Sequence, residues 1–366
     1  MTVSRLSLRH PLGTTPVLVG DGALETFVQE ISGWLADRTV FVVTTPRIWN
    51  LHGATVDPLL SAASDGARFE VPEGEAAKSV ATAERLWGEM LAAEGKRDSR
   101  IISFGGGSVG DLAGYAAGCF LRGISFLQIP TTLLAQVDAS IGGKTGINLP
   151  EAKNSVGLFY HPWATVADTR FLSTLPAAEL RSGLLEVVKI AVVLDKDLFE
   201  DLEGGLDDFL AGDPSRLAPI VARAAQAKIA VVEKDPNEHD LRRLLNFGHT
   251  LGHALEARLD YEALRHGEAV AYGMLFALRL AARRGLHLDA VDRISRLILR
   301  FDLPALPEMD SKELVLLMRR DKKAREAGLI WVLPTRIGSA QPMSGVDEDE
   351  VSRELEIFLD DPSGRP

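Results

Sequence analysis

The chain has 366 residues, 46% hydrophobic and 25% charged, which is ordinary globular composition and too long for one comfortable core, so we expect two domains. Its 40 Lys and Arg residues against 51 Asp and Glu residues give a formal net charge of -11, which disfavours nucleic acid and acidic membranes as partners. An anionic ligand therefore needs a local basic pocket.

Cysteine content and the N-terminal segment bear on the compartment. Cys119 is the single cysteine, which excludes an internal disulfide framework and a cysteine-rich zinc site and fits a reducing compartment. Residues 1–15 contain no continuous apolar run, and the longest apolar stretch, residues 269–278, is about half of what spans a bilayer. We expect an unprocessed cytoplasmic protein.

Short apolar runs bounded by turn residues dominate the first half of the chain. Residues 39–44, 101–104 and 126–129 are apolar without alternation, as in strands buried on both faces of a parallel sheet. Segments with helical spacing, residues 80–93 and 108–120, lie between them. This order of strands and helices predicts an α/β domain with a parallel sheet.

Long helical stretches replace this alternation from about residue 175. The helical spacing covers residues 177–202, 217–234, 249–259, 266–284 and 291–301, with no convincing strand before residues 329–333. We place the boundary between residues 168 and 176. The prediction is an α/β domain over residues 1–172 and a mainly helical domain over residues 173–366.

A glycine-rich turn follows the predicted strand at residues 101–104. Gly105, Gly106 and Gly107 lead into a helix, so backbone N–H groups and the helix dipole can hold a phosphate. The spacing with Gly110 satisfies G-x-G-x-x-G, but the acidic residue expected about 20 positions later in a dinucleotide-binding unit is absent. The turn alone leaves a plain strand-to-helix connection as the alternative.

The stretch at residues 129–157 is too polar for a strand and too rich in glycine for a stable helix, which predicts a structured loop. Lys144, Lys153 and Asn154 can form a phosphate site there, with lysine as the charge and asparagine as a directed donor. A solvated surface loop explains the composition equally well. Further polar residues of the stretch are Thr131, Thr132 and Asp138.

Three segments of the helical half carry glutamate and histidine. Glu186 and Lys189 lie three residues apart on one helix face beside an apolar stripe, where a carboxylate needs a partner. His249 and His253 lie four apart on one side of a helix, and His266 begins another helix. A glutamate and two histidines from separate helices suit zinc with an open position. Spacing does not decide whether His253 or His266 joins His249, and satisfied or surface histidines are the alternative.

Seven sequence blocks occur in an order that resembles the sugar-phosphate cyclase family. They are GGGSVGDLAGYAA, PTTLLAQVDASIGGKTGIN, KNSVGLFYHP, SGLLEVVK, LLNFGHTLGHALE, HGEAVAYGM and the late DKK. Within the family they are most similar to the branch that forms 3-dehydroquinate. The resemblance implies an N-terminal parallel-sheet domain that binds NAD, a mostly α-helical domain that binds metal and substrate, and a homodimer.

The resemblance also implies roles for residues at matching positions. The divalent metal, normally zinc with cobalt as a second choice, falls to Glu186, His249 and His266. NAD contacts fall to Glu75, Lys78, Gly105, Gly106, Gly107, Asp111, Thr131, Thr132, Asp138, Lys144 and Lys153. Substrate contacts fall to Asp138, Lys144, Asn154, Lys189, Lys228, Arg242, Asn246, His253 and one of Lys322 and Lys323, with Arg122 reaching the phosphate in the neighbouring subunit. The implied catalytic residues are Asp138, Lys144, Asn154, Lys189 and His253.

The family reaction gives the expected activity. A seven-carbon keto-acid phosphate, 3-deoxy-D-arabino-heptulosonate 7-phosphate, becomes 3-dehydroquinate and phosphate in the shikimate pathway. Lys228 and Arg242 suit a substrate carboxylate, which favours this branch over the valiolone-forming and deoxy-inosose-forming cyclases. Aminodehydroquinate synthesis shares the carboxylate and is an alternative. A metal-dependent NAD(P) polyol dehydrogenase and a non-catalytic metabolite-binding relative are more distant alternatives.

One turn departs from the family pattern. Where relatives carry an acidic residue in a TDEN-like turn, this chain reads Thr44, Thr45, Pro46 and Arg47. A carboxylate contact to the adenosine ribose is then missing, so we expect NAD to be held more loosely or oriented differently.

Overall fold

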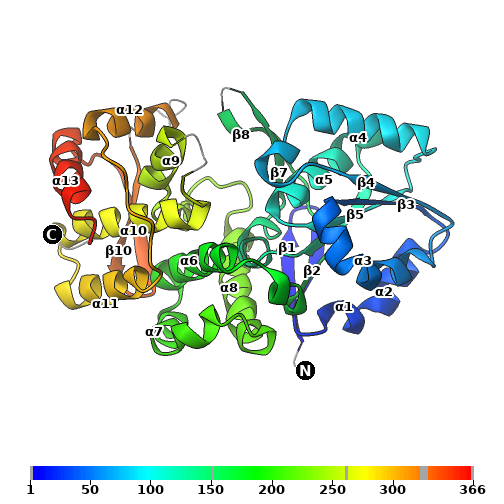
Figure 1. Cartoon of the computed structure of the whole chain (residues 1–366), viewed down its shortest axis with the longest axis horizontal. Helices are drawn as coiled ribbons and strands as arrows, with labels where there is room; N and C mark the ends of the chain where they lie inside the picture. Colours follow the sequence, from blue (N-terminus) through cyan, green and yellow to red (C-terminus); the bar gives the residue numbers. More distant parts are fainter. Residues whose placement is uncertain (1–2, 151, 260–262, 322–328, 364–366) are drawn as a thin grey trace. The chain divides into compact units, whose positions relative to one another are not determined.

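A computed structural model describes residues 3–150, 152–259, 263–321 and 329–363 (Figure 1). Contacts divide the chain into one unit of Met1–Pro176 with Gly212–Asn237 and another of Ala177–Ala211 with Glu238–Pro366. The segment Gly212–Asn237 thus belongs to the first unit, whereas the sequence assigned it to the second domain. The reason is packing, because helix α8 (Pro214–Lys234) lies against β1 (Ser4–His10) and β2 (Gly13–Gly20).

The first unit is built on a seven-stranded sheet with the order β1-β2-β9-β6-β5-β3-β4. The remaining strands are β3 (Thr39–Thr44), β4 (Asp65–Glu70), β5 (Arg100–Gly105), β6 (Ser125–Pro130) and β9 (Ala164–Asp168). β1 and β2 pair antiparallel, and the other neighbours pair parallel. The apolar strands β3, β5, β6 and β9 are almost wholly buried, which confirms the predicted parallel sheet.

Helices cover both faces of this sheet. They are α1 (Ala23–Thr26), α2 (Val28–Leu35), α3 (Pro46–Leu60), α4 (Val80–Ala92) and α5 (Gly107–Cys119). Phe41 belongs to a core cluster with residues of α4 and α5, and Val42 belongs to a second cluster with residues of α1, α2 and α3. Neighbouring residues of one strand thus serve opposite faces, as the twofold strand period requires.

The polar stretch at residues 129–157 is not a loop, so that prediction was wrong. It forms the π-helical turn η3 (Ala135–Ala139) and an antiparallel hairpin of β7 (Lys144–Leu149) and β8 (Ala152–Phe159). A Cβ at Gly157 would lie 2.3 Å from the Thr145 oxygen, so glycine permits this close pairing. The hairpin lies outside the main sheet and β8 is largely exposed, which explains its polar sequence.

The second unit is mainly helical, as expected. It contains α6 (Ala177–Leu194), α7 (Lys196–Leu210), η5 (Leu241–Asn246), α9 (His249–Arg258), α10 (His266–Ala282), α11 (Leu288–Leu299), α12 (Ser311–Asp321), α13 (Glu348–Asp360) and a hairpin of β10 (Trp331–Arg336) and β11 (Ser339–Met343). The predicted helix at residues 177–202 is two helices, because the Asp195 carboxylate accepts from Leu198 N at 3.1 Å and starts α7.

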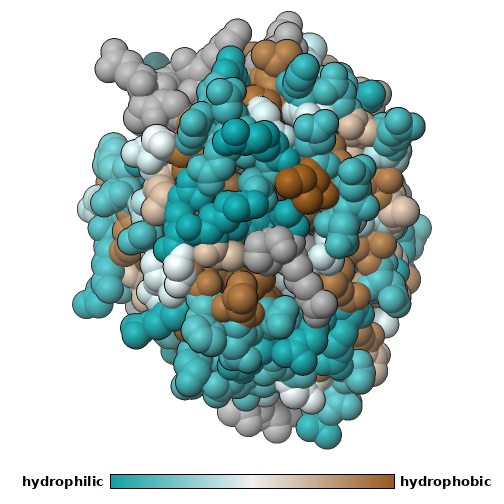
Figure 2. All heavy atoms as spheres, turned by 90° about the vertical axis from the view of Figure 1, so that its left-hand side faces the viewer, coloured by the Kyte–Doolittle hydropathy of each residue, from teal (hydrophilic) through white to brown (hydrophobic). Residues whose placement is uncertain are grey.

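The hydropathy of the surface and of the helices shows where the chain is hydrophilic and whether a helix could span a membrane. Figure 2 shows one face of the chain on which hydrophilic side chains predominate and hydrophobic ones are scattered. Within the described residues, we find no helix with the length and apolar character needed to cross a membrane.

Candidate active site

Three helices of the second unit approach one another through small residues. A Cβ at Gly267 of α10 would lie 2.1 Å from the Ser182 oxygen of α6, and one at Gly273 would lie 1.8 Å from the Gly248 oxygen. Gly248 precedes α9 with a φ of 81°, a conformation that favours glycine. The Gly267 N–H donates to Ser182 Oγ at 3.0 Å. Glycine at these positions therefore lets the start of α10 pack closely on α6 and the start of α9 pack closely on α10.

Glu186, His249 and His266 converge where these helices meet. One ligand atom from each lies within 4.8 Å of the others, and His266 Nε2 lies 3.5 Å from Glu186 Oε1. Glu186 is fully buried and neither oxygen accepts a hydrogen bond from a described residue, while both imidazoles are partly exposed. A buried carboxylate that faces two imidazoles, with a single lysine charge beside it, fits a divalent cation with an open coordination position.

Lys189 and His253 lie beside this cluster. Lys189 forms an ion pair with Glu186, and both side chains are buried on α6. The ring of His253 is 5.2 Å from that of His249 and 6.3 Å from that of His266, between centroids. His253 is not among the three residues whose ligand atoms converge. The geometry therefore favours His249 with His266 as the ligand pair.

The other ring nitrogen of each converging histidine is hydrogen-bonded. His249 Nδ1 lies 3.2 Å from the Phe247 oxygen, and His266 Nδ1 lies 3.4 Å from Glu256 Oε1. Burial and nearby positive charge lower the pKa of His249 well below 6.5. Burial also opposes charge on His266, but the hydrogen bond with Glu256 and the charge of Glu186 raise its pKa. His249 is therefore neutral at neutral pH, the form that binds a metal.

The glycine-rich turn of the first unit joins β5 to α5. Gly106 precedes α5, Gly107 begins it, and the helix has no side-chain cap and no acidic residue in its first turn. Thr131 N donates to the Gly105 oxygen at 2.9 Å, and the buried Thr131 hydroxyl has no partner within the described ranges. A Cβ at Gly106 would lie 3.1 Å from Thr132 Cγ2. An uncapped helix start beside an unsatisfied hydroxyl fits a dinucleotide phosphate.

Lys78 joins several predicted contact residues. Its Nζ donates to Asp111 Oδ2 at 2.7 Å and contacts the side-chain oxygen of Asn154. Burial raises the pKa of Asp111 in spite of the lysine charge. Glu75 is linked to the same region, because Asn148 Nδ2 donates to its Oε2 at 2.8 Å. Residues assigned separately to cofactor and phosphate thus form one polar network.

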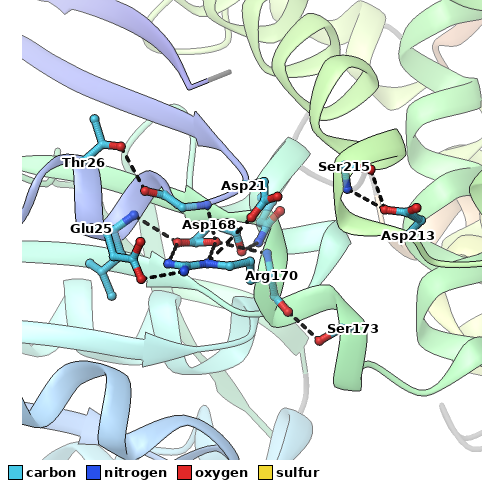
Figure 3. A network of polar contacts seen from close by, with 11 residues as sticks. Asp21, Glu25, Thr26, Asp168, Arg170, Ser173, Asp213 and Ser215 are labelled. Carbon is cyan, nitrogen blue, oxygen red and sulfur yellow. Dashed lines mark hydrogen bonds and ion pairs between the residues drawn. The ribbon is translucent and has the colours of Figure 1, made fainter. Parts of the chain in front are cut away.

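Asp138 and Lys228 form another pair within the first unit. Lys228 of α8 forms an ion pair with the Asp138 carboxylate in η3 and donates to its backbone oxygen at 2.6 Å. Gln136, in the same turn, donates to the Asp168 backbone oxygen at 2.9 Å. The Asp168 carboxylate accepts from Arg170 Nη2 at 2.8 Å within a larger network (Figure 3). This network anchors the turn that carries Asp138.

Three further predicted residues of the first unit lie on its polar turns. Lys144 begins β7 and is exposed, and Lys153 lies on β8. Arg122 is exposed at the end of η2 (Phe120–Arg122), with a φ of 71°. Lys144 and Arg122 thus lie on the surface of the unit, and Lys153 is partly buried.

The remaining predicted substrate residues belong to the second unit. Arg242 is buried in η5, and Asn246 ends that turn, with its Nδ2 donating to Glu238 Oε1 at 3.2 Å. Lys322 and Lys323 lie outside the described residues. Only 3% of Arg242 is exposed, so its charge is not a solvated surface charge.

Thr45, at the turn that departs from the family pattern, starts a helix. Its Oγ1 accepts from Ile48 N at 3.3 Å, and Pro46 follows as the first residue of α3. Threonine as N-cap and proline after it are favoured helix starters. The departure thus has a local structural role.

Glu256 is the site residue that the sequence interpretation missed. It lies on α9, seven residues after His249 and three after His253, so the helical period places all three on one side. This spacing is the sequence feature that could have identified Glu256 as a site residue.

Fold and site together define an enzyme of the sugar-phosphate cyclase class. A 2-epi-5-epi-valiolone synthase from Streptomyces hygroscopicus, solved with NAD+ and Zn2+ bound, has a TM-score of 0.86 and 29% identity over 94% of this chain and 97% of that one. A 2-deoxy-scyllo-inosose synthase, solved with carbaglucose-6-phosphate, NAD+ and Co2+, has a TM-score of 0.87 and 26% identity over 97% of this chain and 99% of that one.

Sequence comparison narrows the assignment. The family described as 3-dehydroquinate synthase matches with its N-terminal part at residues 68–182 and its C-terminal part at residues 183–324. The 3-dehydroquinate synthase of Symbiobacterium thermophilum is 43% identical over 349 residues, covering 94% of this chain and 97% of that protein. The chain belongs to the 3-dehydroquinate synthase family, which confirms the resemblance of the sequence blocks. The alternative activities considered from the sequence are not favoured by these matches.

Proposed function

We propose that the chain converts 3-deoxy-D-arabino-heptulosonate 7-phosphate to 3-dehydroquinate and phosphate, the shikimate-pathway step, with NAD and a divalent metal. The observation that carries the proposal is the convergence of Glu186, His249 and His266. Support also comes from relatives named for this synthesis and from cyclases solved with NAD+ and Zn2+ or Co2+.

Glu186, His249 and His266 would hold the metal, zinc or cobalt. When bound, the metal supplies a Lewis acid for hydroxyl and ketone oxygens of the substrate. Lys189, a buried cation beside Glu186, stabilises negative charge that develops on a substrate oxygen. His253 is partly exposed and can take or return a proton at its ring nitrogen.

The first unit supplies the groups for NAD and phosphate. When bound, NAD supplies reversible oxidation of a ring hydroxyl, so no net oxidation of the substrate results. Backbone N–H groups at Gly106 and Gly107 would bind its phosphates, together with the Thr131 hydroxyl. The further NAD contacts proposed are Glu75, Lys78, Gly105, Asp111, Thr132, Asp138, Lys144 and Lys153.

Opposite ends of the substrate call for different cationic groups. Lys144, Asn154 and Arg122 would bind its phosphate, with Arg122 acting on the neighbouring subunit. Arg242 and Lys228 would bind the carboxylate, since a planar fork and a point charge suit that group. Further proposed substrate contacts are Asp138, Lys189, Asn246, His253 and one of Lys322 and Lys323. The homodimer and the cytoplasmic location stay predictions.

Phosphate release from a panel of sugar phosphates tests the proposal. We expect turnover of the keto-acid phosphate with no net NADH absorbance, little turnover of sedoheptulose 7-phosphate or glucose 6-phosphate, loss of activity on chelation, and recovery with zinc or cobalt. Full activity after metal removal contradicts the metal role. Steady accumulation of NADH would instead indicate a dehydrogenase.

A further inference from the structure

We propose that Glu256 is a positioning residue that holds the ring of His266 with Nε2 directed at Glu186. This inference rests on the proposed metal function and adds to it a residue outside the three converging ligands. The carboxylate of Glu256 acts on the metal site through His266 and does not itself join the ligand cluster.

The ring of His266 lies between two carboxylates. Its Nδ1 is 3.4 Å from Glu256 Oε1, and its Nε2 is 3.5 Å from Glu186 Oε1. A carboxylate at Nδ1 accepts a hydrogen bond from the Nδ1–H group, which leaves the lone pair of a neutral ring on Nε2. The hydrogen bond therefore selects the tautomer whose free lone pair points into the cluster. A negative acceptor also makes the imidazole a better metal ligand.

The two converging histidines differ in the partner of their Nδ1 atoms. His249 Nδ1 faces a backbone oxygen, that of Phe247, at 3.2 Å, so the main chain already orients its ring. His266 is the first residue of α10 and its side chain is 30% exposed, so packing alone does not fix the orientation of its ring. Glu256 supplies the acceptor from α9, and its own side chain is only 9% exposed.

In this arrangement α9 contributes to the metal site in two ways. The helix carries the ligand His249 and, seven residues later, the acceptor for a ligand that belongs to α10. The close contact of α9 with α10 at Gly248 and Gly273 fixes the distance across which Glu256 acts. Loss of the carboxylate should therefore loosen one ligand without disturbing the backbone contact.

The test is the zinc affinity of the metal-free protein, measured by competition with a chromogenic chelator. We expect Glu256→Leu to weaken zinc binding about 10–100-fold, the range for lost outer-shell partners. Glu256→Gln should weaken it less, because the amide oxygen still accepts from Nδ1. Glu354→Gln is the matched control, since Glu354 is also buried in the second unit but pairs with Arg279 and Arg283; its zinc affinity should equal that of the wild type.

A spectroscopic readout separates positioning from general loss of structure. In the cobalt-loaded protein, Glu256→Gln should change the visible absorption bands, whereas Glu354→Gln should leave them unchanged. If the wild type itself binds neither zinc nor cobalt, the proposed function fails. If the wild type binds zinc and a folded variant without an acceptor, Glu256→Leu or Glu256→Ala, matches it in both affinity and cobalt spectrum, the positioning role is overturned.

Discussion

Lys228 and Asp138 form a largely buried ion pair that ties helix α8 to the turn η3. The lysine side chain is 7% exposed and the aspartate side chain 22%, and the ammonium group also donates to the Asp138 backbone oxygen at 2.6 Å. This burial excludes a solvated helix charge as the role of Lys228. A residue proposed to meet the substrate carboxylate thus also fixes the turn that carries Asp138.

This pair predicts strong coupling in a double-mutant cycle. Lys228→Met and Asp138→Asn should each lower the free energy of unfolding by about 1.5–3 kcal/mol, as expected for a charged hydrogen bond that leaves a buried partner unsatisfied. The double variant should lose clearly less than the sum of the two. Urea denaturation measures all three. Strictly additive losses would show that the two side chains act independently, and Glu233→Gln, which breaks the exposed pair with Arg9, should have little effect.

The buried Arg242 predicts a selective loss of substrate recognition. Arg242→Ala should lower kcat/KM for the carboxylate-bearing keto-acid phosphate by about 1.5–3 kcal/mol in transition-state stabilisation, the value of a charged hydrogen bond. Any residual turnover of carboxylate-free sedoheptulose 7-phosphate should be unaffected. Arg243→Ala, the neighbouring arginine in the same turn, is the control. An equal loss on both substrates would remove the carboxylate assignment.

The contact between α6 and α10 predicts that Gly267 cannot be replaced. In Gly267→Ala the new Cβ would lie 2.1 Å from the Ser182 backbone oxygen, so the helices carrying Glu186 and His266 must separate. We expect a loss of about 1–3 kcal/mol or more in stability from overpacking, together with weaker zinc binding. Gly204→Ala, an exposed position of α7 with no atom near the added Cβ, should be neutral or stabilising. Thermal unfolding and chelator competition measure both, and wild-type zinc affinity in Gly267→Ala would contradict the argument.

The strands and helices that the sequence predicted share one property, a strong apolar pattern. β3 and β5 are buried on both faces, and an unbroken apolar run is the pattern that predicts such burial. The hairpin of β7 and β8 lacks that signal because β8 is exposed, so its pairing depends on glycines that local composition assigns to loops. The strand β1 was not predicted from the sequence for a similar reason, since only Leu8 among its residues is buried.

The candidate site was predictable in residue types but not in its arrangement. Spacing along one helix offered His249 with His253, while the converging pair is His249 with His266 from different helices. The second pair depends on the close approach of α9 and α10 at Gly248 and Gly273. Helical periodicity describes one helix at a time and cannot predict a contact between two helices. The family resemblance selected the same pair without that geometry. Glu256 was overlooked because its partner, His266, is likewise on another helix.

The pair of Glu203 on α7 and Arg293 on α11 gives a pH-dependent contribution to stability. Arg293 Nη2 donates to Glu203 Oε2 at 2.7 Å, and Nε donates to Oε1 at 3.1 Å. This hydrogen bonding by Arg293 lowers the pKa of Glu203 from its ordinary value of 4.5. A carboxyl group whose pKa is lower in the folded state adds stability above its unfolded pKa, and that stability is lost as the pH falls through the folded pKa.

Glu203→Gln should therefore cost more stability at neutral pH than in acid. The pair is partly exposed, so we expect a loss of at most about 1 kcal/mol at neutral pH, because solvent screens such pairs. Below pH 4.5 the difference from the wild type should shrink progressively as the wild-type carboxylate takes up a proton. Urea denaturation across the pH range measures this, and in an Arg293→Gln background the substitution should lose most of its pH dependence. A difference that stays constant into acid would mean that the ion pair contributes nothing, since only the charged carboxylate gains from the guanidinium.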